Sequence, residues 1–321
     1  MTRLREIGVV GTVVEDTIDR PGVETVRDMG GAYYAVITLS ALLPDDAVAV
    51  PIVAVGDDAI DRVRADWSRL PRVSLAGVHA VPAINNKVHI EYDAKGGREE
   101  TLTGGVPPLE WARLEPWVDR LDAWCWNFVA GNEADAGTFG RVKRARRGPL
   151  HLDVHSLCLG SPRAGRPREP RRPADWEVWI EGATWVQLNE IEAGLLQEDR
   201  AGPLARDREA KLARRIHGLG AEGLVITRGA RGASWLPREG ERLDVAAAGP
   251  ARDPTGCGDV LGAAWVALRA GHGLDAGAAL CGAVRAGSAA ARIRGTAGLA
   301  EALEQADVVG GTTLRSEETR R

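Results

Sequence analysis

The chain has 321 residues, of which 44% are hydrophobic and 27% are charged, and its formal net charge is −4 at pH 7. These values are typical of a globular protein with a large core, and the sequence shows neither a membrane-spanning run nor a signal peptide. The weak negative charge also argues against a nucleic-acid-binding protein, so we expect a cytoplasmic protein with no nucleic-acid or membrane partner.

The order of short apolar runs and amphipathic stretches predicts alternating strands and helices. Strands are expected at 7–14, 48–55, 123–130, 150–157, 184–188, 223–227 and 233–236. Helices are expected at 31–43, 57–69, 109–121, 133–147, 204–217, 256–271 and 275–293. Several strands are almost continuously apolar, which is typical of a parallel sheet covered on both faces. The pattern therefore predicts one α/β domain over residues 1–321, with a doubly wound, mainly parallel sheet flanked by helices.

Residues 83–103 (AINNKVHIEYDAKGGREETLT) break this alternation. They alternate at period two around the sequence KGGR at 95–98, which predicts a β-hairpin with polar faces. We interpret the hairpin as a small β lid, with contributions from about residues 14–30, that closes over a substrate. Because an exposed lid edge can pair with a second copy of the chain, a homodimer through the lid is also expected.

The stretch DPTGCGD at 253–259 directly precedes an Ala-rich helix. Gly256 and Gly258 permit a tight turn with exposed backbone. The first amides of a helix have no intrahelical partner and lie at the positive end of its dipole. We therefore expect an anion-binding turn here, followed by an acid, Asp259, that the helix dipole keeps ionised.

Two common nucleotide-binding motifs do not account for the chain. No Gly-Lys-Ser/Thr sequence is present, so a P-loop is excluded. The sequence GLGAEG at 218–223 matches GxGxxG, but it follows an expected helix and precedes an expected strand, which is the reverse of the dinucleotide-binding order. Its glycines are better explained as the end of a helix and a loop.

The stretch HLDVH at 151–155 offers an alternative function, a metal-dependent α/β hydrolase. On a strand, His151, Asp153 and His155 would share one face and could hold a metal ion. No fourth ligand cluster accompanies them, and polar residues at the carboxyl end of a strand often line a crevice for other reasons. The four cysteines, at 125, 158, 257 and 281, are too scattered for a CxxC zinc or redox site and are expected to be reduced.

In its motifs the chain resembles the ribokinase-like, or PfkB, carbohydrate kinases. DPTGCGD resembles the DTxGAGD signature of that family, with cysteine in place of the usual alanine. Four further stretches resemble family motifs in the family order: GVVGTVVED at 8–16, GGAYYAV at 30–36, NEIE at 189–192 and TRGARG at 227–232. The resemblance covers nearly the whole chain. It implies a ribokinase-like fold and an ATP-dependent kinase that transfers the γ-phosphoryl group to a hydroxyl of a sugar, polyol or nucleoside.

At the reacting centre, the resemblance assigns Asp259 as the base that accepts the proton of the substrate hydroxyl. The backbone amides of Gly256, Cys257 and Gly258 would stabilise the charge of the phosphoryl group in transfer. A loose transition state deprotonates its nucleophile late, so a modest base is sufficient. Without the other motifs, Asp259 would be explained as an ordinary acid at a helix N-terminus.

On the donor side, the resemblance implies ATP and Mg²⁺ as cofactors. Asn189 and Glu192 would organise Mg²⁺ and its waters, with Glu192 as the metal ligand, a role that suits hard oxygen ligands. The same two residues also fit a helix capping box. Thr227, Gly229 and Gly232 would line the nucleotide site, although the same sequence also fits a β-turn between two strands.

On the acceptor side, the resemblance assigns Asp16 to the substrate hydroxyls. Gly30 and Gly31 would let a polyol approach bare backbone, or could form a simple turn before a helix. The family often has an asparagine a few residues later, where this chain has Ala35 beside two tyrosines. A ring such as an inositol or a nucleoside therefore fits as well as a furanose.

Two points stay outside this assignment. A catalytically inactive ribokinase-like protein that binds ligands as a regulator is a second alternative, disfavoured because Asp259 and its neighbouring glycines are intact. The Arg- and Pro-rich stretch at 161–173 matches no motif and is expected to be a solvated, mobile loop.

Overall fold

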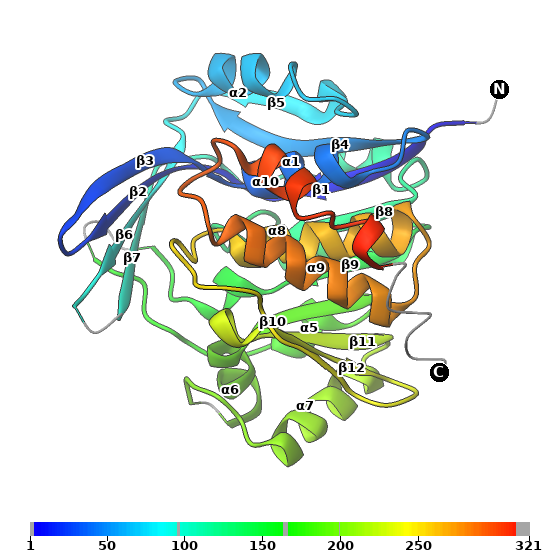
Figure 1. The fold of residues 1–321 in the computed structure, drawn as a ribbon. Coiled ribbons are helices and arrows are strands. Elements are labelled where there is room, and N and C mark those ends of the chain that lie inside the picture. The colour runs from blue at the N-terminus through cyan, green and yellow to red at the C-terminus, as the bar shows by residue number, and fades with distance from the viewer. Residues whose placement is uncertain (1–2, 95–96, 163–165, 199, 313–321) are drawn as a thin grey trace.

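The computed structural model describes residues 3–94, 97–162, 166–198 and 200–312. Within these ranges the centre is a nine-stranded sheet (Figure 1). Its strands are β1 (Arg5–Val10), β4 (Ala47–Gly56), β5 (Val78–Val81), β8 (Ala123–Asn127), β9 (Leu150–Asp153), β10 (Trp185–Asn189), β11 (Gly223–Thr227), β12 (Ala233–Pro237) and β13 (Leu243–Val245). The strand order is β13-β12-β11-β10-β9-β8-β1-β4-β5.

Neighbouring strands run parallel from β5 to β11, and only β12 and β13 join by antiparallel pairing in the described sheet. The strand order reverses at β1, because β4 lies on one side of it and β8 on the other. Every residue of β4 is buried, as the continuous apolar run AVAVPIVAV predicts for a strand covered on both faces. The doubly wound, mainly parallel fold expected from the sequence is confirmed.

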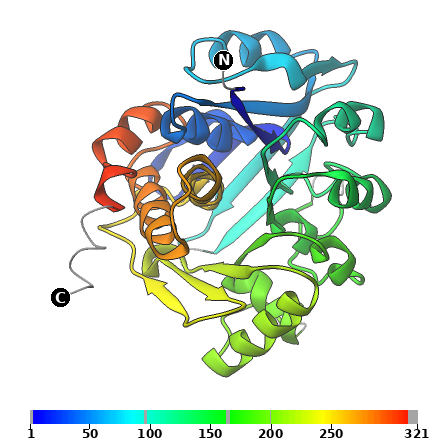
Figure 2. The same cartoon turned by 90° about the vertical axis from the view of Figure 1, so that its right-hand side faces the viewer.

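Helices cover both faces of the central sheet (Figure 2). The helices packed on one face are α1 (Ala32–Leu42), α2 (Ile60–Trp67), α8 (Cys257–Val266), α9 (Ala276–Ala290) and α10 (Leu299–Gln305). Those on the other face are α3 (Trp111–Leu114), α4 (Ala136–Ala145), α5 (Trp176–Ile180), α6 (Glu190–Glu198) and α7 (Arg206–Gly218). Short 3₁₀ turns occupy Leu75–Gly77, Glu115–Trp117, His155–Cys158, Gly229–Arg231 and Gly310–Thr312, and a π-helical turn, Ala267–Gly271, follows α8. No helix in the described ranges is both long enough and apolar enough to cross a lipid bilayer.

Some expected elements are shorter than the sequence suggested. The run 7–14 is not one strand, because β1 ends at Val10 and the chain enters a second sheet at Val13. The run 150–157 leaves the sheet at Asp153 and continues as a 3₁₀ turn. The helix expected at 109–121 shrinks to α3, since Pro116 cannot donate a helical hydrogen bond.

The described residues also form a four-stranded sheet, hereafter the lid sheet, from β2 (Val13–Arg20), β3 (Val23–Gly31), β6 (Asn86–Tyr92) and β7 (Arg98–Thr103). Its order is β3-β2-β6-β7, and it projects to the left of the central sheet in Figure 1. Residues 95–96 of the expected hairpin turn lie outside the described residues. The expectation that both hairpin faces are polar is wrong, because one face buries a small apolar cluster of Val14, Ile18, Val88, Ile90, Leu102 and Ala130.

The Arg- and Pro-rich segment fastens the lid sheet to the body of the protein. Arg168 is buried there, which differs from the solvated loop expected for 161–173. Its guanidinium pairs with the buried carboxylate of Glu100 on β7 and donates to the carbonyl oxygen of Ala130 at 2.9 Å. Its backbone amide also donates to the Glu100 carbonyl at 2.7 Å. The arginine therefore joins the outer lid strand to the chain that follows β8.

We predict that Arg168→Ala lowers the free energy of unfolding by about 3 kcal/mol, because truncation leaves the buried Glu100 carboxylate with one fewer cation. Urea unfolding measures this loss. Arg171→Ala is the matched control, since its exposed side chain lies three residues away in the same segment, and its effect should stay within about 0.5 kcal/mol. Equal effects of the two variants would show that Arg168 does not anchor the lid sheet.

Candidate active site

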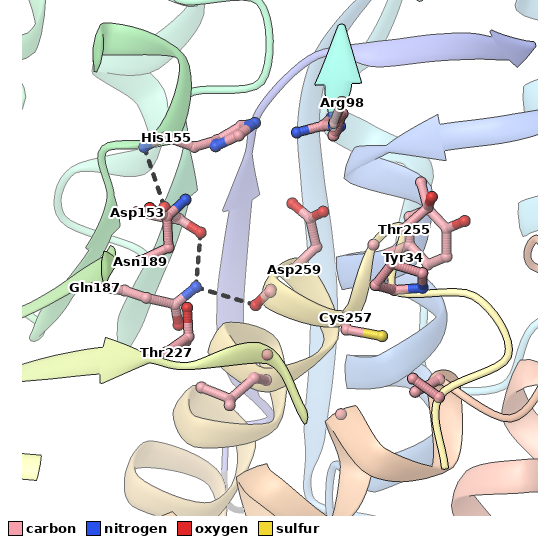
Figure 3. Close-up of a pocket in the computed structure, with 18 of the residues that line it drawn as sticks. Tyr34, Arg98, Asp153, His155, Gln187, Asn189, Thr227, Thr255, Cys257 and Asp259 are labelled. Carbon is pink, nitrogen blue, oxygen red and sulfur yellow. Dashed lines mark hydrogen bonds between the residues drawn. The ribbon is translucent and has the colours of Figure 1, made fainter. Parts of the chain in front are cut away.

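A cavity of about 610 Å³ lies at the carboxyl ends of the central strands and is covered by the lid sheet. This is the edge at which open α/β sheets bind ligands. The cavity collects nearly all of the residues that the sequence singled out: Asp16, Gly31, Asn189, Glu192, Thr227, Gly229, Gly232, Gly256, Cys257, Gly258 and Asp259. Gly30 does not line the cavity but packs against the Asp16 carboxylate. Figure 3 shows His155, Arg98 and Asp259 directed toward the same space from three different elements.

The turn before α8 presents backbone amides to this cavity. Gly256 caps α8 with a φ of 74°, and a Cβ there would meet the ring of Tyr34 at 2.4 Å, so both conformation and space require glycine. The Cys257 amide donates to the Pro254 carbonyl at 3.3 Å. Within the described ranges, the Gly256 and Gly258 amides have no hydrogen-bond acceptor in the protein. Two amides at a helix N-terminus are therefore free to bind an anion.

Asp259 lies in the first turn of α8, with Asn127 at the end of β8 as its partner. The Asn127 amide donates to the Asp259 carboxylate at 2.9 Å. Burial raises the pKa of Asp259, and the Asn127 hydrogen bond opposes this rise only in part. The sequence analysis considered only the helix dipole, whereas desolvation has the largest effect on the pKa of Asp259. A carboxylate with a raised pKa is also a stronger base.

Asp16 faces the cavity from β2 of the lid sheet, within the segment expected to contribute to the lid. Burial raises its pKa to about 8, and the nearby carboxylates of Glu100 and Asp259 add to this effect. A Cβ at Gly30 would lie 1.8 Å from a carboxylate oxygen of Asp16, so glycine is required to make room for the acid. Near neutral pH this group therefore retains its proton in part and can donate as well as accept hydrogen bonds.

Glu100, also on the lid sheet, has a lowered pKa, in contrast to Asp16. Burial disfavours its charge, but Arg98 and Arg168 hold the pKa of the Glu100 carboxyl below its usual value. Arg98 donates to one Glu100 oxygen at 2.6 Å, while Arg168 pairs with the other. Glu100 is thus a carboxylate whose charge the two arginines stabilise, and it orients Arg98 at the cavity wall.

Asn189 and Glu192 form a reciprocal capping box at the start of α6. The Asn189 side-chain oxygen accepts from the Glu192 amide at 3.0 Å, and the Glu192 carboxylate accepts from the Asn189 amide at 2.7 Å. The ring of His155 lies 2.9 Å from the other Glu192 oxygen. Although burial opposes a charged imidazole, Glu192 raises the pKa of His155 to about 9. Both Glu192 oxygens are therefore already hydrogen-bonded to the protein.

The half of the cavity that lies away from the lid sheet has a different lining. Thr227, Gly229 and Gly232 lie at the end of β11 and in the turn after it. Small and apolar residues line the rest of this half: Ala230, Ala247, Ala248, Gly249, Ala251, Leu261, Val284, Gly287, Ser288 and Ala291. The result is an apolar groove between the chain after β13 and the last turns of α9.

The residues of the hydrolase alternative do not converge. His151 is fully buried beneath α8, and in the described part of the chain neither of its ring nitrogens has a hydrogen-bond partner. Asp153 ends the strand and reaches the cavity, and His155 lies on the following 3₁₀ turn. Across the residues that the structure describes, no three His, Cys, Asp or Glu side chains form a group that could hold a metal ion.

The sequence analysis missed Arg98 and Gln187, which line the cavity, and Asn127, which holds Asp259. The Gln187 amide donates to the Asp153 carboxylate at 2.7 Å and to the Gly258 carbonyl at 3.0 Å, which ties β9 to the first turn of α8 (Figure 3). Asn127 and Gln187 are polar residues near the carboxyl ends of otherwise apolar strands, a signal that could have identified them. Arg98 carries no such signal, because it looks like an ordinary hairpin residue.

Comparison with known proteins finds a family match over part of the chain. Residues 167–305 match the family model of the pfkB family carbohydrate kinases. No curated protein matches the chain. The resemblance is thereby confirmed over the part of the chain that carries the motifs at 189–192, 227–232 and 253–259.

Solved structures share the fold. Ribokinase from Arabidopsis thaliana, complexed with ribose and ATP, is 16% identical with a TM-score of 0.71 and covers 95% of this chain and 99% of its own. A pyrophosphate-dependent kinase in the ribokinase family, complexed with a pyrophosphate analog and myo-inositol, is 18% identical with a TM-score of 0.74. It covers 93% of this chain and 99% of its own. A nucleoside kinase from Methanocaldococcus jannaschii is 14% identical with a TM-score of 0.61, and it covers 94% of this chain and 99% of its own. The fold is therefore that of ribokinase-family sugar, polyol and nucleoside kinases.

The raised pKa of Asp16 predicts a pH-dependent stability. The folded protein keeps the Asp16 proton up to about pH 8, whereas the carboxyl in the unfolded chain loses it near its ordinary pKa of 3.8. The wild type therefore loses stability as the pH rises through this window, and Asp16→Asn does not share this loss. Urea unfolding of both proteins without ligand, from about pH 5 to about pH 8.5, should show the difference shifting in favour of the variant. A difference that stays constant with pH would contradict the raised pKa.

Proposed function

We propose that this chain, which has the ribokinase-like fold and a match to the pfkB family carbohydrate kinases over residues 167–305, is an ATP-dependent kinase for a hydroxyl of a sugar, polyol or nucleoside. The observation that carries the proposal is the cavity itself. One continuous space joins a polar half under the lid sheet to an apolar groove beside α9, and Asp259 with the free amides of Gly256 and Gly258 lies where the halves meet.

The polar half suits an acceptor with several hydroxyls. Asp16 can both donate and accept there, and Gly31 leaves bare backbone at the wall. Tyr34 is the tyrosine that lines the cavity, whereas Tyr33 packs against Trp67 with its hydroxyl on Asp66. A flat ring face at this position favours a cyclic acceptor.

The apolar groove suits a nucleobase. Its small side chains leave the space between α9 and the segment after β13 unfilled, and an apolar slot of this kind buries a planar ring. Pyrophosphate would make no use of this groove, because it has no base to place there. Nucleotide is therefore the proposed donor, with Thr227, Gly229 and Gly232 near its phosphates.

The proposed transfer needs only proton acceptance and charge stabilisation. The acceptor hydroxyl gives its proton to Asp259 as its oxygen bonds to the γ-phosphorus, and the bond from that phosphorus to the bridging oxygen of ADP breaks. The Gly256 and Gly258 amides stabilise the phosphoryl oxygens, and an anion could also draw the weakly bonded Cys257 amide away from Pro254. Asn127 fixes the orientation of the Asp259 carboxylate.

The cavity is suited to a divalent ion that arrives with the nucleotide. Its acidic wall fits Mg²⁺, but both oxygens of Glu192 already accept hydrogen bonds. Mg²⁺ commonly keeps several waters and is bound by substrate phosphates with one or two carboxylates. We propose that Glu192 and Asn189 hold such waters and that Asp153 adds negative charge beside them. When bound, the ion would neutralise phosphate charge.

The two alternatives carry less support. A ligand-binding protein without catalysis would not need Asp259 oriented by Asn127 beside free amides. The hydrolase would need its three residues to meet at a metal ion, which they do not do.

A homodimer through the lid sheet stays a prediction. β3 is an open edge strand, whereas β7 is partly covered by the segment that contains Arg168. Light scattering at high protein concentration would detect the dimer.

Asp259→Asn should reduce turnover about 10²–10⁴-fold, because the amide keeps the shape of the side chain but cannot take the hydroxyl proton. Nucleotide affinity should be retained, since the amide cradle is untouched. Single-turnover transfer and calorimetric nucleotide binding on the same preparations separate the two effects. Asp275→Asn is the matched control: Asp275 caps α9 through the Ala278 amide at 2.9 Å, at the end of that helix away from the cavity. Near wild-type transfer by Asp259→Asn would remove Asp259 as the base.

The donor is tested by offering ATP, GTP and pyrophosphate at equal concentrations with one accepted alcohol. ATP should support transfer and pyrophosphate should not, because only a nucleotide fills the apolar groove. The measurement is the initial rate of product formation for each donor. Faster transfer from pyrophosphate than from ATP would overturn the nucleotide assignment and leave the groove without a role.

A further inference from the structure

The lid sheet makes a second contact with the body of the protein, directly at the turn before α8. Arg20, the last residue of β2, donates to the Asp253 carboxylate at 2.8 Å. The side chains are 16% and 2% exposed, so this ion pair is shielded from solvent. The Arg20 guanidinium also lies over the ring of Tyr92, 4.2 Å from its centroid, and the Tyr92 hydroxyl is 3.4 Å from the Thr255 hydroxyl. Two lid strands therefore hold residues 253–255.

Asp253 shapes the turn that carries the free amides. The oxygen that accepts from Arg20 also accepts from the Thr255 amide at 2.9 Å, which folds the chain toward Gly256. Its second oxygen is buried, and no group in the described ranges donates to it. Burial disfavours the charge of this carboxylate, but the Arg20 and Thr255 hydrogen bonds hold its pKa below the usual value. The turn is thus built on a buried anion whose counter-ion comes from the lid sheet.

Removal of that counter-ion would leave a buried carboxylate without a cation. Such a group is costly to bury, and the segment would relieve the cost by taking up a proton or by turning the carboxylate toward solvent. Either change alters the turn that sets the Gly256 and Gly258 amides. The backbone amide of Asp253 is fixed to the Ala291 carbonyl at 3.0 Å, so the adjustment falls on the residues that follow Asp253.

We propose that Arg20 is a positioning residue that acts through Asp253 and makes the phosphate-binding turn dependent on a docked lid sheet. The proposal rests on the kinase function proposed above. Asp16, assigned to the acceptor hydroxyls, precedes Arg20 by four residues on β2. One strand therefore carries both the acceptor contact and the counter-ion of the donor turn. Binding of an acceptor under the lid and formation of the phosphate-binding turn would favour each other.

The test uses the full-length protein and the variant Arg20→Met, which keeps an apolar stem over Tyr92 but has no charge. We expect kcat to fall about 100-fold, because the contacts of the transferring phosphoryl group are misplaced, with a smaller rise in the acceptor KM. ADP should also bind more weakly in calorimetry. Arg20→Lys should restore most of the lost turnover, and guanidinium ion at non-denaturing concentration should partly rescue Arg20→Met. Arg27→Ala, which removes an exposed arginine from β3 of the same sheet, is the control and should match the wild type.

Three results would overturn the proposal: wild-type kcat in Arg20→Met, a loss that neither lysine nor guanidinium ion reduces, or a loss confined to the acceptor KM. If Arg20→Met does not fold, the double variant Arg20→Met/Asp253→Asn is measured instead, because an amide needs no counter-ion. It should fold and turn over, and its failure to do so would also overturn the proposal. An inactive wild type would count against the kinase function, and the ADP titrations of wild type and Arg20→Met would still decide the role of Arg20.

Discussion

The burial of many carboxylates around one cavity is the constraint on which the rest of this site depends. Among the described lining residues, five are acidic: Asp16, Glu100, Asp153, Glu192 and Asp259. Carboxylates that share a dry space repel one another, and each must keep a proton or find a cation. The raised pKa of Asp16, of Asp153 (about 7) and of Asp259 shows which of them lack sufficient cations. The same groups are then available to bind hydroxyls, to accept a proton or to meet a metal ion.

The cations that do compensate these acids come from elements far apart in the chain. Arg98 and Arg168 neutralise Glu100 and join the lid sheet to the Arg- and Pro-rich segment. Arg20 reaches from the end of β2 to Asp253. Electrostatic compensation therefore also determines architecture, since the ion pairs that make burial of the acids tolerable are the ones that hold the lid sheet over the cavity. Loss of the ion pair between Arg20 and Asp253 would therefore alter the turn before α8.

The fold could be predicted from local signals, and the residues of the site could be predicted only in part. Apolar runs gave the central strands because burial on both faces leaves a clear pattern. Asp259 and Gly256 were found because a helix start has a local sequence signature, although their roles stay predictions. Arg168 could not be found, since its partner Glu100 is 68 residues away and nothing in the sequence pairs them. The raised pKa of Asp259 could not be predicted for a related reason: desolvation depends on the folded surroundings, whereas the helix dipole can be inferred from the local sequence.

Above all, the two halves of the cavity are proposed to bring an alcohol and a nucleotide together. The most direct test is ADP release from ATP by the wild-type protein, measured with a panel of sugars, inositols and nucleosides, with phosphorus NMR of the products. The account predicts that at least one alcohol stimulates ADP release and that a phosphate ester forms in equal amount. ADP release that no alcohol stimulates, or that yields only inorganic phosphate, would contradict it.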